Sequence, residues 1–178
     1  MYRVLLAGFI LIVIMSCDSR PEFNYDFETE ADLDTLWWKC GTFFTLTDEH
    51  VTSGRKSLKV EFFPDPGSGD HYPGLSLGGF ARDWTGYQEL RVDIFNPEQE
   101  PLKLAVRIDD SKNPQYKDRH NDSILLRVGA NQAFIKLEIL ATPNNKKKLD
   151  LENIQSVIFF LVNPTKRHTL FFDNIRLE

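Results

Sequence analysis

Leu-Lys-Leu-Ala-Val-Arg-Ile-Asp, residues 102–109, is the stretch of sequence that decides the fold. Its large aliphatic side chains recur at every second position, with shorter or charged side chains between them. Successive side chains of a β-strand point to opposite faces, so the pattern predicts a strand with one buried face and one face open to solvent or ligand. Arg107 and Asp109 are expected on the open face.

The same period of two appears on both sides of this stretch, and helical periodicity is scarce. Further strands are predicted at residues 57–63, 89–95, 123–128, 133–138, 156–162 and 169–177. Breaks are predicted at Asn96-Pro97, Asn113-Pro114, Gly129-Ala130-Asn131 and Asn163-Pro164. Single helical turns are predicted over residues 31–37 and 150–154, the second with Asp150 as its N-cap. We therefore expect an all-β fold, a two-sheet antiparallel β-sandwich of the jelly-roll type.

Composition indicates one acidic domain. The chain has 26 Asp plus Glu against 21 Lys plus Arg, a net charge of -5, so no overall positive field favours nucleic acid. The basic run Lys146-Lys147-Lys148 follows Pro143 and two asparagines, and we interpret it as a solvated loop tip rather than a binding patch.

The N-terminus resembles a bacterial lipoprotein signal. A cationic start precedes the apolar run 4–15, and residues 14–17, Ile-Met-Ser-Cys, resemble a lipobox whose cysteine is lipidated and becomes the new N-terminus. The resemblance implies a signal at 1–17, a short tether at 18–22 and a domain at 23–178, membrane-anchored through Cys17 in the periplasm or at the cell surface. The alternative is an ordinary secretory signal or membrane anchor that contains a cysteine.

Cys40 is the second cysteine of the chain. If Cys17 is acylated, no intramolecular disulfide can form. Because aromatic residues surround Cys40 in the sequence, we expect a buried, inert thiol, with intermolecular pairing as the alternative.

Three segments resemble a known family: residues 25–28 (Tyr-Asp-Phe-Glu), 51–60 and 171–177. They look like the start, the second-strand hairpin and the final strand of carbohydrate-binding modules with the galactose-binding-like jelly-roll fold. With residues 93–97, 107–110 and 118–121 they also resemble domains appended to some agarases and some VanZ-like membrane proteins. The resemblance implies a carbohydrate ligand lying across the concave sheet, on strand positions matched by Arg107 and Asp109.

The resemblance also implies a structural calcium ion that joins the first and last strands. The matching positions are Glu28, Lys56 and Asp173, and calcium commonly combines carboxylates with backbone carbonyls. The alternative is that Glu28 and Asp173 accept backbone hydrogen bonds or pair with Arg55.

Polar and aromatic residues in the middle of the chain supply the chemistry that binds sugars, namely planar side chains and bidentate hydrogen-bonding groups. The candidate carbohydrate-binding residues are His71, Tyr72, Arg107, Asp109, Arg119 and Asn121. A salt-bridge network across neighbouring strands is an equal alternative for the arginines and Asp109.

Other aromatic residues divide between the core and the surface. Trp84 is expected in the core, and Tyr72 and Tyr116 are expected to be exposed. Trp37 and Trp38 are adjacent, so only one of them can face inward in an extended segment.

Common enzyme signatures are missing from the sequence: it has no Gly-x-Ser-x-Gly, no phosphate-binding glycine loop, and no zinc motif. Asp109 and Asp110 suit a glycosidase only if a further carboxylate faces them across a cleft. We therefore expect a non-enzymatic, lipid-anchored module that binds a polysaccharide or envelope glycan. A structural or protein-interaction domain of the envelope is the first alternative, and a small glycoside hydrolase is the second.

Overall fold

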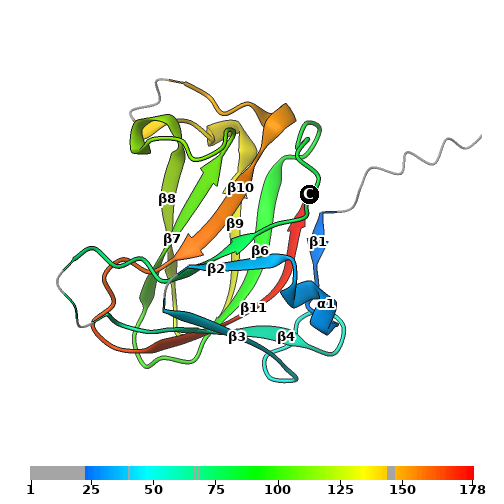
Figure 1. Cartoon of the computed structure of the whole chain (residues 1–178). Coiled ribbons are helices and arrows are strands. Elements are labelled where there is room, and N and C mark those ends of the chain that lie inside the picture. Colours follow the sequence, from blue (N-terminus) through cyan, green and yellow to red (C-terminus); the bar gives the residue numbers. More distant parts are fainter. Residues whose placement is uncertain (1–22, 40, 66, 68, 144–146) are drawn as a thin grey trace, which may run out of the picture.

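The computed structural model describes residues 23–178, apart from residues 40, 66, 68 and 144–146. The described chain folds into two antiparallel sheets that face one another (Figure 1). The predicted all-β, two-sheet sandwich is confirmed.

Sheet A has the strand order β3-β4-β11-β6-β9, and the short β1 also pairs with β11. Sheet B has the order β2-β5-β10-β7-β8. The strands are β1 Asn24–Tyr25, β2 Leu36–Lys39, β3 Thr42–Thr47, β4 Ser57–Phe62, β5 Gly74–Leu77, β6 Glu89–Asn96, β7 Leu102–Asp109, β8 His120–Leu126, β9 Gly129–Lys136, β10 Ser156–Phe160 and β11 His168–Leu177. The helical elements are α1 Glu30–Leu33 and 3₁₀ turns at Tyr116–Asp118, Leu137–Ile139 and Leu151–Asn153.

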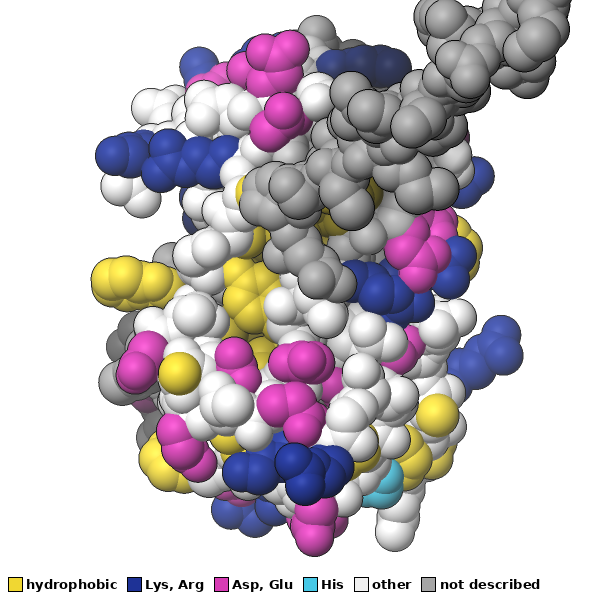
Figure 2. Space-filling model, turned by 90° about the vertical axis from the view of Figure 1, so that its right-hand side faces the viewer, with side chains coloured by type: hydrophobic (Ala, Val, Ile, Leu, Met, Phe, Trp, Pro, Cys, Tyr) yellow, Lys and Arg dark blue, Asp and Glu magenta, His cyan; other side chains and the backbone are white. Residues whose placement is uncertain are grey.

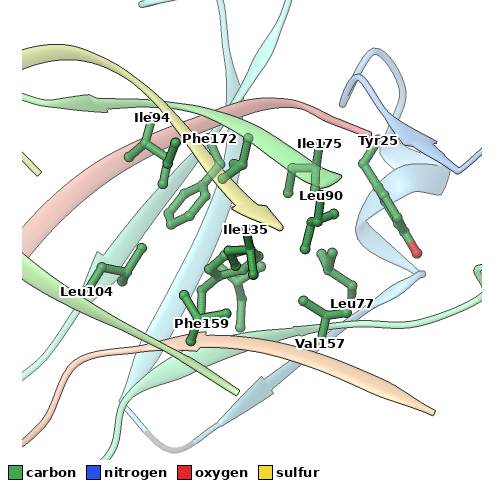
Figure 3. Packing of buried hydrophobic residues seen from close by; sticks show 14 of the residues in the cluster. Tyr25, Leu77, Leu90, Ile94, Leu104, Ile135, Val157, Phe159, Phe172 and Ile175 are labelled. Atoms are coloured by element: carbon green, nitrogen blue, oxygen red, sulfur yellow. The ribbon is translucent and has the colours of Figure 1, made fainter. Parts of the chain in front are cut away.

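The core fills the space between the sheets with alternate side chains from each (Figure 3). Leu104 of β7 and Phe159 of β10 enter from sheet B, and Phe172 of β11 enters from sheet A, all with no exposed surface. The Phe159 and Phe172 rings meet across the sandwich with their centroids 5.7 Å apart. Burying a side chain of this kind stabilises the fold by roughly 1.5–3 kcal/mol, so this layer holds the two sheets together.

Strands with clear alternation lie where they were predicted. β7 begins at Leu102 and ends at Asp109, and β4, β6, β10 and β11 match their predicted ranges to within two residues. The Asp150 side chain accepts a hydrogen bond from the Glu152 N–H at 3.1 Å, which confirms the predicted cap. Trp84 is fully buried, and the Tyr72 and Tyr116 side chains are exposed, as expected.

Two local predictions were wrong. Gly129-Ala130-Asn131 is not a break but the start of β9, which pairs with β6 from its first residue. Asn131 accepts from the Arg127 N–H and donates to the Arg127 carbonyl, both at 2.8 Å, so it holds the short connection from sheet B to sheet A. The helical turn predicted over 31–37 is shorter, because Leu36 already belongs to β2.

Other predictions lie outside the described residues, among them the lipoprotein signal, Cys17 and Cys40. Of the basic run, Lys147 and Lys148 are described, and both are exposed. Lys147 Nζ lies 3.1 Å from the buried Asp110 carboxylate. In residues 23–178, apart from the same gaps, no helix has the length and apolar character needed to span a membrane. Figure 2 shows basic and acidic side chains interspersed over one side of the molecule.

Candidate functional site

The outer face of sheet B, the side turned away from the core, carries the candidate site. The strand register places five residues in one row across this face: Trp37, Ser76, Ile158, Arg107 and Asn121. The row crosses all five strands of the sheet. Paired residues of neighbouring strands point to the same side, so these side chains share one surface.

Arg107 and Asp109 lie on β7, next to the edge strand β8, and bind each other. Arg107 Nε donates to Asp109 Oδ1 at 2.8 Å, and Nη2 lies 2.7 Å from Oδ2. Their side chains are 17% and 3% exposed. Two parallel N–H···O bonds hold the guanidinium plane in one orientation, so Arg107 is fixed on the surface. The alternative of a salt-bridge network is thus present in part: Arg107 and Asp109 form an ion pair, but along one strand rather than across two.

Arg119 adds a second guanidinium beside this pair. Ile108 pairs with His120, and Arg119 precedes β8 in an extended conformation, so it lies next to Asp109 across the ladder. Its guanidinium carbon lies 5.3 Å from the centre of the Tyr116 ring. Arg119 Nε is shielded from solvent and has no hydrogen-bond partner among the described residues. Burial, with Arg107 as the next contributor, lowers the pKa of Arg119.

Exposed aromatic side chains surround these charges. Tyr72 is 43% exposed and packs edge-on against Phe160 of β10, with a centroid distance of 6.0 Å. Burial and Asp70 raise the pKa of Tyr72, and the positive charge of Arg119 opposes that shift. Tyr116 is 64% exposed next to Arg119. The predicted residues Tyr72, Arg107, Asp109 and Arg119 are therefore brought to one surface.

Trp37 belongs to the face but was not among the predicted site residues. It is 71% exposed at the β2 edge, whereas the preceding Leu36 is buried. A Cβ on Gly78 would lie 2.8 Å from the Trp37 indole Nε1, so the ring lies over a glycine that leaves room for it. The signal for Trp37 was the adjacent Trp37-Trp38 pair, but its position beside β5 required the sheet order.

The other two predicted residues differ in position. Asn121 lies in the row beside Arg107 on β8, and its Nδ2 is 3.5 Å from the Arg119 carbonyl oxygen. The His71 ring, in contrast, lies 3.0 Å from the Phe63 carbonyl oxygen and lines a cavity of about 390 Å³ with Asn163. The structure groups His71 with that loop cavity rather than with the Arg107 row.

Two of the predicted calcium residues, Glu28 and Asp173, bind the loop between β3 and β4, which ends at the third, Lys56. Glu28 Oε1 accepts the N–H groups of Arg55 and Lys56 at 2.7 and 2.9 Å. Gly54, at φ 66, brings the backbone against this carboxylate, and any Cβ there would collide with it. This is the backbone hydrogen bonding that the alternative interpretation expected for Glu28.

Asp173 is held by the same loop. Its Oδ2 accepts the N–H groups of Thr52 and Ser53 at 2.6 and 2.8 Å and the Thr52 hydroxyl at 3.1 Å, and its Oδ1 accepts the Asn174 N–H at 2.7 Å. A carboxylate has about four acceptor positions, so Asp173 would have to exchange N–H donors for an ion. Among the described residues, the hydrogen bonds to Glu28 use only its Oε1, so its second oxygen could accept further partners. No group of three acidic, His or Cys side chains suited to a metal occurs among the described residues. Calcium at Glu28, Lys56 and Asp173 stays a prediction.

The remaining acidic neighbours, Asp109 and Asp110, have separate partners. Asp110 Oδ2 accepts from Lys147 Nζ at 3.1 Å and from the Asp150 N–H at 3.0 Å, whereas Asp109 is bound to Arg107. Burial alone would raise the pKa of Asp110, but these hydrogen bonds hold it below its usual value. Both carboxylates are thus committed to basic or N–H partners.

Comparison with known proteins places this surface on a familiar scaffold. No protein-family model matches the chain. The family 11 carbohydrate-binding module from Clostridium thermocellum, solved with a β-1,3-1,4-mixed-linked tetrasaccharide, superposes with a TM-score of 0.63. It is 19% identical, and the match covers 88% of this chain and 94% of the module. This match supports the β-sandwich fold.

Agarases provide the other similar proteins. An exo-β-agarase structure superposes with a TM-score of 0.65 at 16% identity, over 81% of this chain and 23% of the enzyme. In sequence, the β-agarase B of Vibrio sp. (strain JT0107) is 24% identical over 145 residues, 74% of this chain. The chain spans only about 15% of that curated relative. It therefore has the β-sandwich found in carbohydrate-binding modules and in a part of these agarases.

Proposed function

We propose that the outer face of sheet B binds a carbohydrate chain and performs no chemical step on it. One observation carries the proposal: exposed planar side chains, Trp37 and Tyr72, share a face with the fixed Arg107–Asp109 pair. Planar rings pack against the C–H faces of sugars, and oriented polar groups bind hydroxyl groups. The fold shared with carbohydrate-binding modules supports the same function.

The dimensions of the face favour a chain over a single sugar. Trp37 and Asn121 stand at the two edge strands of sheet B, four strand spacings apart. Each spacing is about 4.8 Å, so the row is roughly 19 Å long. A ligand that contacts both ends must extend across several strands, as an oligosaccharide does.

If the face instead bound a protein partner, we would expect a broad apolar surface. Leu125 of β8 is 68% exposed and Trp37 of β2 is 71% exposed, but they lie on opposite edge strands. Ser76 and Arg107 lie on strands between them, and Ile158, which separates these two in the row, is only 6% exposed. This interruption of apolar surface by polar side chains favours a hydroxyl-rich ligand.

The proposed setting is the outer surface of a membrane, with Cys17 lipidated and the domain displayed in the periplasm or at the cell surface. The Ile14 to Cys17 lipobox resemblance supports it. A binding module tethered in this way retains a polysaccharide or envelope glycan at the membrane.

Glycan-array screening of the detergent-solubilised full chain tests the proposal, followed by calorimetric titration of each hit. We expect an oligosaccharide to bind with an affinity that falls when Tyr72 is replaced by alanine. The exposed Phe43 of sheet A is a matched control, because Phe43→Ala removes an aromatic ring elsewhere. Equal losses in both variants, or binding to no glycan, would refute the proposal.

A further inference from the structure

Beside the Arg107–Asp109 pair, Arg119 is a cation without a salt bridge of its own in the described part of the chain. Arg107 engages both oxygens of Asp109, so that pair is neutral. Arg119 makes no ion pair with a carboxylate in the described part of the chain, and its shielded Nε lacks an acceptor. The Arg119 guanidinium therefore contacts the Tyr116 ring and lies within electrostatic range of Asp109, but its Nε has no hydrogen-bond partner among the described residues.

The surroundings of Arg119 make that charge costly without a ligand. Burial first and Arg107 second act to lower its pKa, which means that both disfavour the charged form. Arginine nevertheless stays protonated in proteins. Asp109 offsets part of this penalty, and a further negative group would offset more of it, whereas a neutral hydroxyl would satisfy a donor without adding compensating charge.

The geometry around Arg119 suits such a group. The Tyr116 ring lies against the guanidinium at 5.3 Å, which restricts its orientation, and the side chain is only partly buried. A planar guanidinium offers parallel N–H donors that match two oxygens of a carboxylate or sulfate. Tyr72 and Arg119 also influence each other electrostatically, so the cation lies within electrostatic range of a ring that the proposed function uses for stacking.

We propose that Arg119 makes the site selective for a glycan that carries an anionic substituent, a carboxylate or a sulfate. The inference rests on the proposed function of this face. It adds that the cation of Arg119 is a specificity determinant, and that acidic glycans bind more tightly than neutral glycans of the same length.

The test compares three oligosaccharides of equal length by calorimetry on the full chain: a neutral agaro-oligosaccharide, a sulfated carrageenan oligosaccharide and an oligogalacturonate. We expect at least one of the two acidic probes to bind about tenfold or more tightly than the neutral one at low ionic strength. The preference should shrink in about 0.5 M salt, because salt screens partly exposed charges. Whether the carrageenan or the galacturonate gains more distinguishes sulfate from carboxylate.

Variants assign the effect to the residue. Arg119→Gln should remove most of the preference for the acidic probe, and Arg119→Lys should keep part of it, since the charge remains without the planar fork. Lys117→Gln, at an exposed lysine two residues earlier, removes the same charge outside the site and should keep the preference. Thermal melts of each variant exclude loss of folding.

The outcomes separate the two proposals. Equal binding of neutral and acidic probes, or a preference that persists in Arg119→Gln, overturns the inference and leaves carbohydrate binding intact. Binding of none of the three probes overturns both.

Discussion

Arg107 holds both carboxylate oxygens of Asp109, the residue two positions later on the same strand, with N···O distances of 2.8 and 2.7 Å. The pair lies on the outer face of sheet B, yet the Asp109 side chain is only 3% exposed. A carboxylate so far removed from water depends on its partner for stability. The arginine therefore supports the fold as well as the proposed binding surface.

We predict that Arg107→Ala destabilises the protein by about 3 kcal/mol, because it leaves a buried carboxylate without its partner. The double replacement Arg107→Met with Asp109→Leu should be closer to the wild-type stability, since it removes both charges together. Urea unfolding measures both. If the double variant is as unstable as Arg107→Ala, packing rather than the unpaired charge is responsible.

Because Asp110 is buried and hydrogen-bonded, we predict that the stability of the protein falls at acid pH. Its pKa lies below the usual 3.8, since hydrogen bonds from Asp150 and Lys147 outweigh the effect of burial. A carboxyl group whose pKa is lowered by folding stabilises the protein at pH values above its ordinary pKa. That contribution is lost as the pH falls through the lowered pKa. Asp110→Asn should therefore be less stable than wild type at pH 7, and should lose less further stability below about pH 4.

Unfolding curves at neutral and acid pH check this difference. Glu152→Gln is the control, because Glu152 is an exposed carboxylate on the neighbouring 3₁₀ turn. Parallel loss of stability with acid in Asp110→Asn and wild type would show that another group governs the response.

Melting curves can test the prediction that calcium binds at Glu28, Lys56 and Asp173. An ion bound only to the folded state adds about 2.7 kcal/mol of stability at a hundredfold excess over its Kd. EDTA should then lower the melting temperature, and Asp173→Ala should abolish that response. If EDTA changes nothing and metal analysis finds no calcium, the prediction is wrong, and Glu28 and Asp173 are held to the β3–β4 loop by hydrogen bonds without an ion.

The lipid anchor is tested independently of the fold. Intact-mass measurement of protein extracted from membranes should show a lipid-modified Cys17 at the N-terminus. Cys17→Ser should release the domain or leave the precursor uncleaved. An unmodified Cys17 in the extracted protein contradicts the prediction.

Side-chain alternation made much of this fold predictable from sequence. In β7 the inward positions are all aliphatic, so the strand and the outward direction of Arg107 and Asp109 follow from their spacing. In β9 the same period is present, with Ala133 and Ile135 buried, but Gly129 and Asn131 read as a turn. Asn131 instead uses its side chain to hold the connection at Arg127, a contact that local propensity does not reveal.

The site was less predictable because it depends on which strands become neighbours. Arg119 lies beside Asp109 only through the β7–β8 register. Trp37 reaches the same face only because β2 joins β5, a strand some forty residues later in the chain. No local pattern specifies that pairing. His71 and Tyr72 are adjacent in sequence, yet their rings contact different parts of the fold.

Two tryptophans give the sharpest test of the binding face, because they differ in exposure and not in chemistry. Trp37 is 71% exposed on sheet B, whereas Trp84 is fully buried and packs against Phe23 with centroids 5.4 Å apart. Trp37→Ala should leave the melting temperature nearly unchanged and weaken glycan binding by about tenfold, which corresponds to 1.4 kcal/mol. Trp84→Ala should cost about 3–5 kcal/mol of stability through the cavity it leaves.

Tryptophan fluorescence supplies the readout for the same pair. Ligand binding should shift the emission of wild-type protein, because a sugar that covers Trp37 excludes water from its ring. The shift should be absent in Trp37→Ala, in which Trp38 and the buried Trp84 remain. Unchanged affinity and an unchanged emission shift in Trp37→Ala would place the glycan elsewhere on the molecule, since a ligand that crosses the whole of sheet B must contact the ring at its edge.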